Sequence, residues 1–358
     1  MKKVHNFSAG PGILPAEVLQ QAADACINFD NLNLSLLEIS HRSKNFEAVI
    51  DESRELVKEL LGVGAGWQVL FLGGGASQQF AMVPYNLLRE NGSAAYVNTG
   101  VWASKAIKEA KILGNTKVIA SSEDKQFGYI PKGYEIPADA DYLHITSNNT
   151  IYGTQMKSFP KSPIPVVCDM SSDIFSKPVD GNQFALIYAG AQKNMGPAGA
   201  TMVAVREDIL GKTERKMLSM MDYRVHIKGG TMYNTPPVFP IYVVMLTLRW
   251  LKKNGGLSWI ESVNNAKAKL MYDEIDRNSL FKGTVINQED RSNMNATFVM
   301  TKPELEPEFD KMWKAADISG IRGHRDVGGY RASLYNALPL ESVQALVEVM
   351  QAFEKQYA

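Results

Sequence analysis

One lysine of the chain stands where lysines are rare. The stretch 185–199, ALIYAGAQKNMGPAG, begins as an apolar strand and continues as a run of small residues, with Lys193 between the two parts. Small neighbours let a bulky group approach the amine closely. Partial burial would lower the pKa of the amine, and a neutral amine is a nucleophile toward carbonyl groups. The pattern indicates a reactive lysine, and the alternative is an ordinary solvated one.

Two further chemical groups also follow predicted strands. Asp169 comes directly after the apolar run 165–168, where it could cap a turn or pair with a cationic group of a ligand. Residues 73–77, GGGAS, join another strand to a helix, and such a turn offers backbone N–H groups and the positive end of the helix to a phosphate. This turn lacks the P-loop lysine and the dinucleotide-binding spacing, so alone it is equally consistent with a tight turn.

A phosphate cradle, an acid and a nucleophilic amine would lie together, because ligands of open α/β sheets bind beyond the carboxyl ends of the strands. Pyridoxal phosphate needs all three, for its phosphate, its pyridine nitrogen and its aldehyde. Trp102, shortly after the apolar run 94–98, could cover the flat ring, although a tryptophan is more often a core residue. The sequence thus predicts a pyridoxal-phosphate site in which Lys193 and Asp169 are catalytic.

Two histidine–arginine pairs suggest an anionic substrate. They are His41-Arg42 and His324-Arg325, in a chain with only 5 histidines. Each pair presents a fork of donors that suits a phosphate or a second carboxylate. The alternative is two unrelated solvated loops. Arg331, shortly after the second pair, could hold an α-carboxylate with two hydrogen bonds.

Seven short apolar runs must position these groups. Runs that are apolar throughout are typical of strands covered by helices on both faces, so we predict an α/β fold with a mostly parallel seven-stranded sheet. The last run follows the 190s loop too closely for a helical crossover and is predicted to be antiparallel. The runs are 69–72, 94–98, 117–120, 142–146, 165–169, 185–189 and 201–205.

Helices are predicted from Pro15 onward, over 45–61, over 238–254 and over about 258–278. The first should bury one face, formed by Val18, Leu19, Ala22, Cys26 and Phe29. Beyond residue 258, strands at 283–287 and 296–300, a helix and a final helix at 340–357 indicate a smaller α+β domain. We therefore predict a large domain of residues 16–258 and a small domain of residues 1–15 and 259–358, consistent with the length of 358 residues.

Composition narrows the class of protein. Lys plus Arg equals Asp plus Glu at 38 each, which gives no electrostatic reason to expect nucleic acid or a membrane as partner. No signal-peptide core and no 18-residue apolar run is present, so a cytoplasmic protein is expected. Cys26 and Cys168 are predicted to be buried and reduced. No ligand spacing suggests a metal.

The chain as a whole resembles the phosphoserine aminotransferase family, a class V branch of the fold-type I pyridoxal-phosphate enzymes. The order and spacing of the matching stretches, over nearly the full length, make the resemblance specific. It implies an N-terminal strap, a large cofactor domain, a small C-terminal domain and a homodimer that shares its active sites. The stretches are NFSAGPGILP, EISHRSKNF, VLFLGGGASQQF, NTGVWASKA, CDMSSDIFSKPVD, YAGAQKNMGPAG, MYNTPPVFPIY and GHRDVGGYRASLYNALPLESV.

The resemblance also implies roles for individual residues. Lys193 would be the Schiff-base lysine, Asp169 would pair with the pyridine nitrogen, and Trp102 would stack on the ring. The remaining cofactor contacts would come from Thr150 near the phenolic oxygen, and from Ala76, Ser77, Gln192 and the other subunit's Asn234 and Thr235 around the phosphate. Some relatives have an arginine where this chain has Ser77, whose hydroxyl and N–H can still bind an anion.

The substrate contacts and the reaction follow from the same resemblance. Arg331 would bind the α-carboxylate, and His41, Arg42, His324 and Arg325 would bind the anionic side chain. The implied reaction exchanges an amino group between O-phosphoserine/3-phosphohydroxypyruvate and glutamate/2-oxoglutarate in serine biosynthesis. A phosphorylated hydroxythreonine of vitamin B6 synthesis is an additional implied substrate.

Three rival functions are weaker. A cysteine desulfurase needs an exposed nucleophilic cysteine, whereas both cysteines lie in apolar patterns. A transaminase for small uncharged amino acids does not need two histidine–arginine pairs. A phosphate-binding protein without catalysis leaves Lys193 unexplained.

Overall fold

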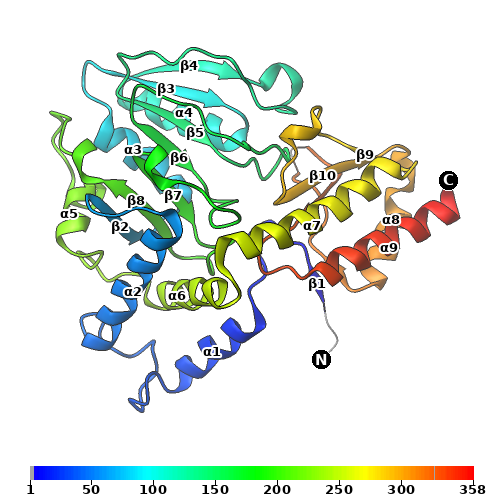
Figure 1. Cartoon of the computed structure of the whole chain (residues 1–358), viewed down its shortest axis with the longest axis horizontal. Coiled ribbons are helices and arrows are strands. Elements are labelled where there is room, and N and C mark those ends of the chain that lie inside the picture. Colours follow the sequence, from blue (N-terminus) through cyan, green and yellow to red (C-terminus); the bar gives the residue numbers. More distant parts are fainter. Residues whose placement is uncertain (1–3, 326) are drawn as a thin grey trace.

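The computed structural model describes residues 4–325 and 327–358, and its largest element is a seven-stranded sheet (Figure 1). The strand order is β2-β8-β7-β6-β5-β3-β4. β8 is antiparallel to both neighbours and the other pairings are parallel, as predicted. All seven predicted runs are strands: β2 (Trp67–Leu72), β3 (Ser93–Asn98), β4 (Asn115–Ser121), β5 (Tyr142–Thr146), β6 (Val166–Asp169), β7 (Leu186–Gly190) and β8 (Thr201–Arg206).

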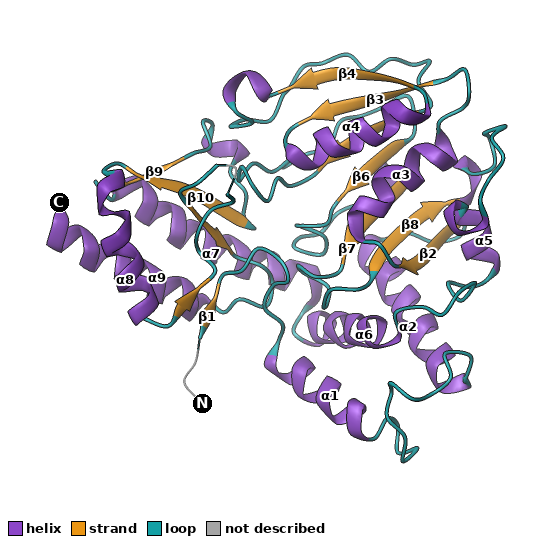
Figure 2. Cartoon of the chain, turned by 180° about the vertical axis from the view of Figure 1, so that it is seen from behind, coloured by secondary structure: helices purple, strands orange, loops and turns teal. Residues whose placement is uncertain are grey.

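Helices cover both faces of this sheet. On one face lie α3 (Gly75–Leu87) and α4 (Val101–Leu113), as Figure 2 shows, with the short α5 (Tyr223–Lys228) near β2. On the other face lie α2 (Lys44–Leu61) and α6 (Val238–Lys253), which pack against each other. α2 begins at Ser43, whose hydroxyl accepts a hydrogen bond from the Phe46 N–H, and ends at Gly62 in the left-handed conformation. Two buried apolar clusters, one on each face, result.

The first helix, α1 (Ala16–Ile27), corrects one prediction. Val18 and Ala22 are buried, but Leu19 is 52% exposed and Cys26 is only half-buried. α1 packs mainly on α6, so a narrow stripe of the helix is covered and the flanking positions face solvent. The prediction that Cys26 is buried is therefore wrong, whereas Cys168 is buried in β6, and both are free thiols.

The C-terminal part has its own sheet and apolar cluster. Its strands β9 (Phe281–Gly283), β10 (Asn295–Met300) and β12 (Tyr330–Ser333) form an antiparallel sheet in the order β12-β10-β9. The helices α7 (Gly256–Arg277), α8 (Glu306–Ala315) and α9 (Leu340–Tyr357) accompany it. β1 (His5–Asn6) pairs in parallel with β11 (Ile318–Ser319), which ties the N-terminal segment to this part. The predicted domain limits stay a prediction.

The strand predicted at 283–287 exists in the C-terminal part, but the predicted position along the chain is wrong. The strand is Phe281–Gly283, because the Phe281 ring packs against Phe298 and Phe309 in the core. After Gly283, Val285 is buried but Ile286 is 55% exposed, and the strand ends at Gly283. None of the residues 283–287 belongs to the C-terminal apolar cluster, whereas Phe281, just before them, does.

α7 contributes to both apolar clusters and carries a buried lysine. Ile260 lies in the cluster of the large sheet, and Met271 and Ile275 lie in the C-terminal cluster. Lys267 is fully buried, and its amine donates hydrogen bonds to the carbonyl oxygens of Leu334 and Tyr335 at 2.9 and 2.8 Å. Burial lowers the pKa of Lys267 to about 7.

We expect Lys267→Met to destabilise the protein more at pH 9 than at pH 6. The folded pKa lies below the ordinary value of 10.5, so the unfolded state binds more protons between these values and the stability of the parent rises with pH in that window. The variant lacks this gain, and two buried carbonyls lose their donor, a loss of about 1–3 kcal/mol at pH 9. Urea unfolding at the two pH values measures the difference.

Lys269→Met is the control for that experiment. Lys269 lies on the same helix, exposed, and pairs with Asp273 four residues on. An exposed pair of this kind contributes little, so the control should change the free energy of unfolding by less than about 1 kcal/mol at both pH values. Equal effects of the two substitutions at pH 9 would show that the buried amine does not support the fold.

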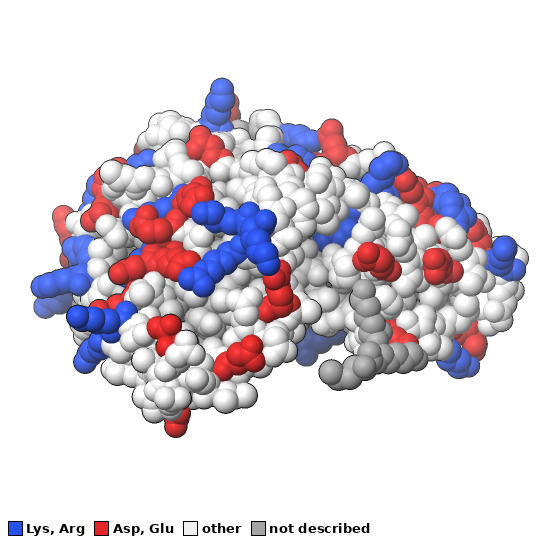
Figure 3. Space-filling view, turned by 60° about the horizontal axis from the view of Figure 1, so that its bottom comes forward, with Lys and Arg blue, Asp and Glu red and all other residues white. Residues whose placement is uncertain are grey.

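Surface charges of both signs are mixed. On the face in Figure 3, basic and acidic side chains lie next to each other, and the chain has 38 of each kind. Arg249 of α6 is paired with Glu52 of α2. Within the described residues, no helix combines the length and apolar character that crossing a membrane requires.

Candidate active site

A cavity of about 300 Å³ lies at the carboxyl ends of β5, β6 and β7. It brings together most of the residues that the sequence singled out. Thr146 and Asp169 end two of these strands, and Lys193 follows the third. The cavity is lined by Ala9, Gly10, Gly75, Ala76, Ser77, Trp102, Thr146, Asn148, Thr150, Ile151, Asp169, Ser171, Ser172, Gln192, Lys193, His324 and Arg331.

Lys193 presents its amine to the cavity from the turn after β7. The Nζ atom donates a hydrogen bond to the Thr150 hydroxyl at 2.9 Å and lies 6.0 Å from the centre of the Trp102 ring. Burial lowers the pKa of Lys193 to about 8, with the Asp169 charge acting against this and the Arg331 charge adding to it. The neutral, nucleophilic form of the amine is therefore far more populated near neutral pH than in an ordinary lysine.

Asp169 is almost completely buried at the end of β6, with 4% of its surface exposed. Burial raises its pKa, while hydrogen bonds from Ser171 and Tyr188 and the charge of Lys193 lower it. The N–H of Ser171 donates to Oδ1 at 2.9 Å. A buried carboxylate in this position can hold a proton on a basic nitrogen of a ligand.

The first turn of α3 is open to an anion. Gly74, with φ +83°, precedes the helix. It has no side chain that could accept hydrogen bonds from the first N–H groups of α3. A side chain at Gly74 would be strained and would meet Gln78 at 2.5 Å. Ala76 and Ser77 lie in this turn and line the cavity. The N-terminal end of α3 therefore suits a phosphate.

Trp102 lies in the first turn of α4 and lines the same cavity. Its Nε1 atom is buried and finds no hydrogen-bond partner among the described residues. The amine of Lys105, one turn further on, is 4.7 Å from the centre of its ring. The ring is thus held by a cation, and its N–H is available to a ligand.

Arg331 enters the cavity from β12, in the C-terminal part of the chain. Its Nη1 atom donates to the backbone oxygen of Thr150 at 3.3 Å, so Arg331 and Lys193 contact the same residue. Its Nε atom is buried without a hydrogen-bond partner among the described residues. Unused donors of a partly buried guanidinium suit a carboxylate. His324 also lines the cavity.

The N-terminal segment closes one side of the cavity. The Gly12 N–H donates to the Gln192 oxygen at 2.7 Å, and the Tyr335 hydroxyl donates to the Ala9 oxygen at 2.7 Å. A Cβ atom on Gly10 would lie 3.6 Å from the Lys193 side chain, and φ at Gly10 is +146°. A Cβ atom would fit beside the lysine, and it is the positive φ that favours glycine at this position of the segment.

Five of the predicted residues do not line this cavity in the chain that contains it. Among the described residues, Asn234 and Thr235 lie exposed in the loop between α5 and α6, and His41 and Arg42 precede α2. Arg325 follows His324 but is not part of the lining. Their roles stay predictions.

Several lining residues were not predicted as site residues. They are small or amide side chains at the ends of β5 and β6: Thr146, Asn148, Ser171 and Ser172, with Ile151 and the N-terminal Ala9 and Gly10. Their position after apolar runs was a usable signal for the first four. Polar residues of this size are common in turns, so residue type alone does not distinguish them from turn residues.

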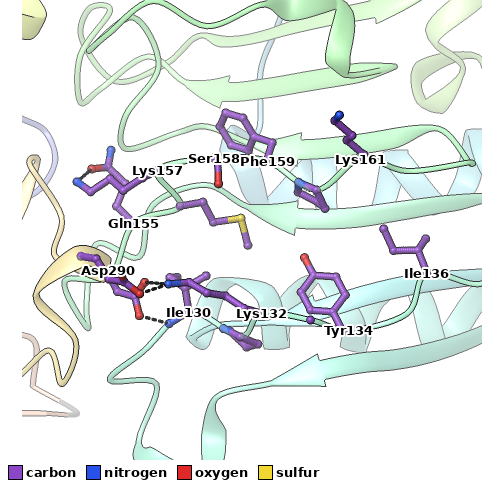
Figure 4. Close-up of a pocket in the computed structure, with 15 residues that line it drawn as sticks. Ile130, Lys132, Tyr134, Ile136, Gln155, Lys157, Ser158, Phe159, Lys161 and Asp290 are labelled. Carbon is purple, nitrogen blue, oxygen red and sulfur yellow. Dashed lines mark hydrogen bonds and ion pairs between the residues drawn. The ribbon is translucent and has the colours of Figure 1, made fainter.

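A second cavity, of about 510 Å³, is larger than the first and is shown in Figure 4. It lies between the segments 130–136 and 155–161. Its Lys132 is paired with Glu289 and Asp290, and its Lys157 donates to the amide oxygens of Gln155 and Asn293. Because these amines already have partners, we assign the active site by chemistry and not by volume.

The described residues contain no group of three His, Cys, Asp or Glu side chains placed to hold a metal ion. The 300 Å³ cavity combines an amine of lowered pKa, a buried carboxylate, an anion site at a helix end and an arginine. Such a set can bind a phosphorylated aromatic aldehyde and an amino acid side by side.

Comparison with known proteins agrees with this chemistry. The family model described as "Aminotransferase class-V" matches residues 4–346. A phosphoserine aminotransferase of Flavobacterium psychrophilum is 66% identical over 355 residues, which are 99% of each chain.

Solved structures give the same result. That of phosphoserine aminotransferase from Bacillus circulans subsp. alkalophilus has a TM-score of 0.97 at 46% identity and covers 100% of both chains. That of a phosphoserine aminotransferase with bound PLP from Trichomonas vaginalis has a TM-score of 0.92 at 35% identity and covers 98% of this chain and 100% of the other. The chain belongs to the class V aminotransferase family.

Proposed function

We propose that this chain transfers the amino group of glutamate to 3-phosphohydroxypyruvate, giving 2-oxoglutarate and O-phosphoserine, with pyridoxal phosphate as cofactor. The observation that supports this most is the joint presence of Lys193, Asp169 and Arg331 in one cavity. The full-length relatives named phosphoserine aminotransferase support the choice of substrate. The reaction would belong to serine biosynthesis in the cytoplasm.

The residues of the cavity fit the cofactor. The uncapped N-terminal end of α3, with Ala76, Ser77 and Gln192, would hold its phosphate. Asp169 would hold the proton of its ring nitrogen, and Trp102, whose N–H has no partner among the described residues, would cover the ring. When bound, pyridoxal phosphate supplies an aldehyde that bonds to amines and a ring that accepts the electrons left by a departing α-proton.

Residues of the chain itself would bind the substrate, transfer the proton and exclude water. Arg331 binds the α-carboxylate of the amino acid, which fixes the α-carbon relative to Thr150 and therefore relative to Lys193. With its pKa at about 8, the Lys193 amine can accept the α-proton at Nζ and return it nearby as general base and acid. The N-terminal segment, held to Gln192 and Tyr335, limits the access of water.

We expect His324 and its neighbours to bind the side chain of the substrate. We expect Arg331→Ala to lower kcat/KM for phosphoserine and for alanine alike, because both carry the α-carboxylate. His324→Ala should lower kcat/KM for phosphoserine only. Each loss of a charge-assisted contact should cost roughly 1.5–3 kcal/mol, or about 10- to 150-fold. Steady-state kinetics with both amino acids measures the two effects.

Arg322→Ala is the matched control. Arg322 precedes the same loop, but it pairs with Glu306 and Asp310 and does not line the cavity. It should leave both kcat/KM values within about twofold. A parent enzyme that prefers alanine, or a His324 variant with an unchanged substrate ratio, would exclude phosphoserine as the substrate.

We also propose a homodimer whose active sites are shared. Asn234 and Thr235 are exposed and precede Pro236-Pro237, which stiffens a loop that does not line the cavity of its own chain. Arg42 is exposed as well, and His41 has a buried Nε2 atom without a partner among the described residues. Both pairs would serve the partner's cavity, at the phosphate and at the substrate respectively.

Mixing an inactive variant with an impaired one tests the shared site. In a hybrid dimer of Lys193→Ala and Arg42→Ala chains, a shared arrangement leaves one cavity with both native residues and the other with neither. After unfolding and refolding an equal mixture, about a quarter of the parent activity should return. If Arg42 serves its own chain, no native cavity forms in the hybrid and the mixture keeps only the mean activity of the two separate variants.

A further inference from the structure

A row of buried polar side chains lies behind Asp169 in the large sheet. Asp169 of β6 is the register partner of Tyr188 of β7. The Tyr188 hydroxyl oxygen is 2.8 Å from Nε2 of His144, which lies on β5, and the two rings are 5.9 Å apart. Tyr188 and His144 are 0% and 1% exposed. Neither lines the cavity, so neither is expected to touch a substrate.

The register places these three side chains on one face. Residues paired across neighbouring strands point to the same side of a sheet, and side chains alternate along each strand. His144 pairs with Val167, which is two residues before Asp169, and Asp169 pairs with Tyr188. His144, Asp169 and Tyr188 therefore share a face, the one covered by α3 and α4. The row runs from β5 across β6 to β7.

The proton on the His144 ring can be located. Burial lowers the pKa of His144 to about 3, so the ring is neutral and has one N–H. Nδ1 is buried and has no hydrogen-bond partner among the described residues. A buried N–H is left unpaired more rarely than an acceptor, so the hydrogen belongs on Nε2, which donates it to the Tyr188 oxygen.

This assignment fixes the direction of the next hydrogen bond. Because the Tyr188 oxygen accepts from His144, its own hydrogen is free to point to Asp169. Tyr188 and Asp169 are register partners on this face, so the hydroxyl lies on the side of the carboxylate. Burial raises the pKa of both groups; Tyr188 opposes this at Asp169, and the Asp169 charge adds to it at Tyr188. The other groups that act on Asp169 are Ser171, Lys193 and the neighbouring carboxyl of Asp173.

We propose that Tyr188, oriented by His144, is a positioning residue that keeps the Asp169 carboxylate ionised and directed at the ring nitrogen of the cofactor. The proposal rests on the proposed function, because it gives Asp169 that role. The two residues act through Asp169 and are not catalytic themselves. Their contribution should appear in kcat and in cofactor affinity, while the KM for amino acids, set by Arg331 and His324, should change little.

Tyr188→Phe tests this with the holoenzyme. We expect kcat to fall roughly 10-fold or more and the dissociation constant for pyridoxal phosphate to rise, since one hydrogen bond to a buried charge is lost. His144→Leu should produce a smaller loss in the same direction. Tyr142→Phe is the matched control, because Tyr142 lies on β5, is fully buried and bonds through its hydroxyl to Tyr96 at 2.7 Å. The control should lower Tm as much and leave kcat unchanged.

A double-mutant cycle separates positioning from general support of the sheet. In the Asp169→Asn background, Tyr188→Phe should have little further effect on cofactor affinity, because the carboxylate on which it acts is gone. An effect of the same size in both backgrounds, or a kcat of Tyr188→Phe within twofold of the parent, would overturn the proposal. A parent protein that fails to bind pyridoxal phosphate would refute the proposed function instead, so the two failures are distinguishable.

Discussion

Replacing Lys193 by alanine should abolish transamination and leave the fold intact. Lys193 supplies both the amine that bonds the cofactor and the base at the α-carbon, so we expect a loss of at least about 10³-fold in kcat. The amine makes one side-chain hydrogen bond, to Thr150, and is partly desolvated as a cation, so its removal should cost little stability. Borohydride reduction followed by mass measurement should attach pyridoxal phosphate to the parent and not to the variant.

Lys157→Ala is the control for Lys193→Ala. Lys157 also has a pKa lowered to about 8 by burial, but it lies in the cavity of Figure 4 and donates to Gln155 and Asn293. A lowered pKa alone should not make a lysine reactive toward the cofactor. We therefore expect the Lys157 variant to keep its activity and its borohydride-stable attachment. Normal turnover by the Lys193 variant would contradict its assignment.

The large sheet could be predicted because its strands are covered on both faces. Runs without polar alternation, such as 142–146 and 185–189, match β5 and β7 within one residue. The C-terminal part was harder to predict, because β9 has only three residues and only the first of them is buried. Phe281 and Ile286 look alike in sequence, yet only Phe281 reaches the core. Periodicity does not reveal how much of an element its neighbours cover, which is also why Leu19 was misplaced.

Residues of the candidate site could be predicted where their type is unusual for their sequence surroundings. Lys193 among small residues and Asp169 after an apolar run are unusual, and both line the cavity. Tyr188 and His144 gave no such signal, since a tyrosine and a histidine inside strands resemble core residues. Their importance depends on strand order and register, which single runs do not specify. Residues that a second chain would contribute in the proposed dimer cannot be recognised from the cavity of one chain.

Asp169→Asn should be the second most damaging substitution. Asparagine preserves the shape and can accept the Ser171 hydrogen bond, but it lacks the charge that holds a proton on the ring nitrogen of the cofactor. Removing one partner of a buried charge pair costs about 3–5 kcal/mol, which corresponds to a fall in kcat of roughly 150- to 5,000-fold. The fold should survive, because burial raises the pKa of Asp169 and a neutral amide avoids that desolvation cost. Stopped-flow or steady-state rates, with Tm as the folding check, measure both expectations.

Asp173→Asn distinguishes the specific charge from the local potential. Asp173 is equally buried, four residues further on, and accepts hydrogen bonds from Ser147 and Gln155, but it does not line the cavity. Asp169→Asn and Asp173→Asn each remove one negative charge near Lys193. Each of these two carboxylates raises the pKa of Lys193. If the field at Lys193 were what matters, the two variants would lose activity together. We expect Asp173→Asn to stay within about tenfold of the parent rate, because only Asp169 lies where a ring nitrogen can be reached. A parent-like rate for Asp169→Asn would mean that Asp169 serves only as the cap of the turn after β6.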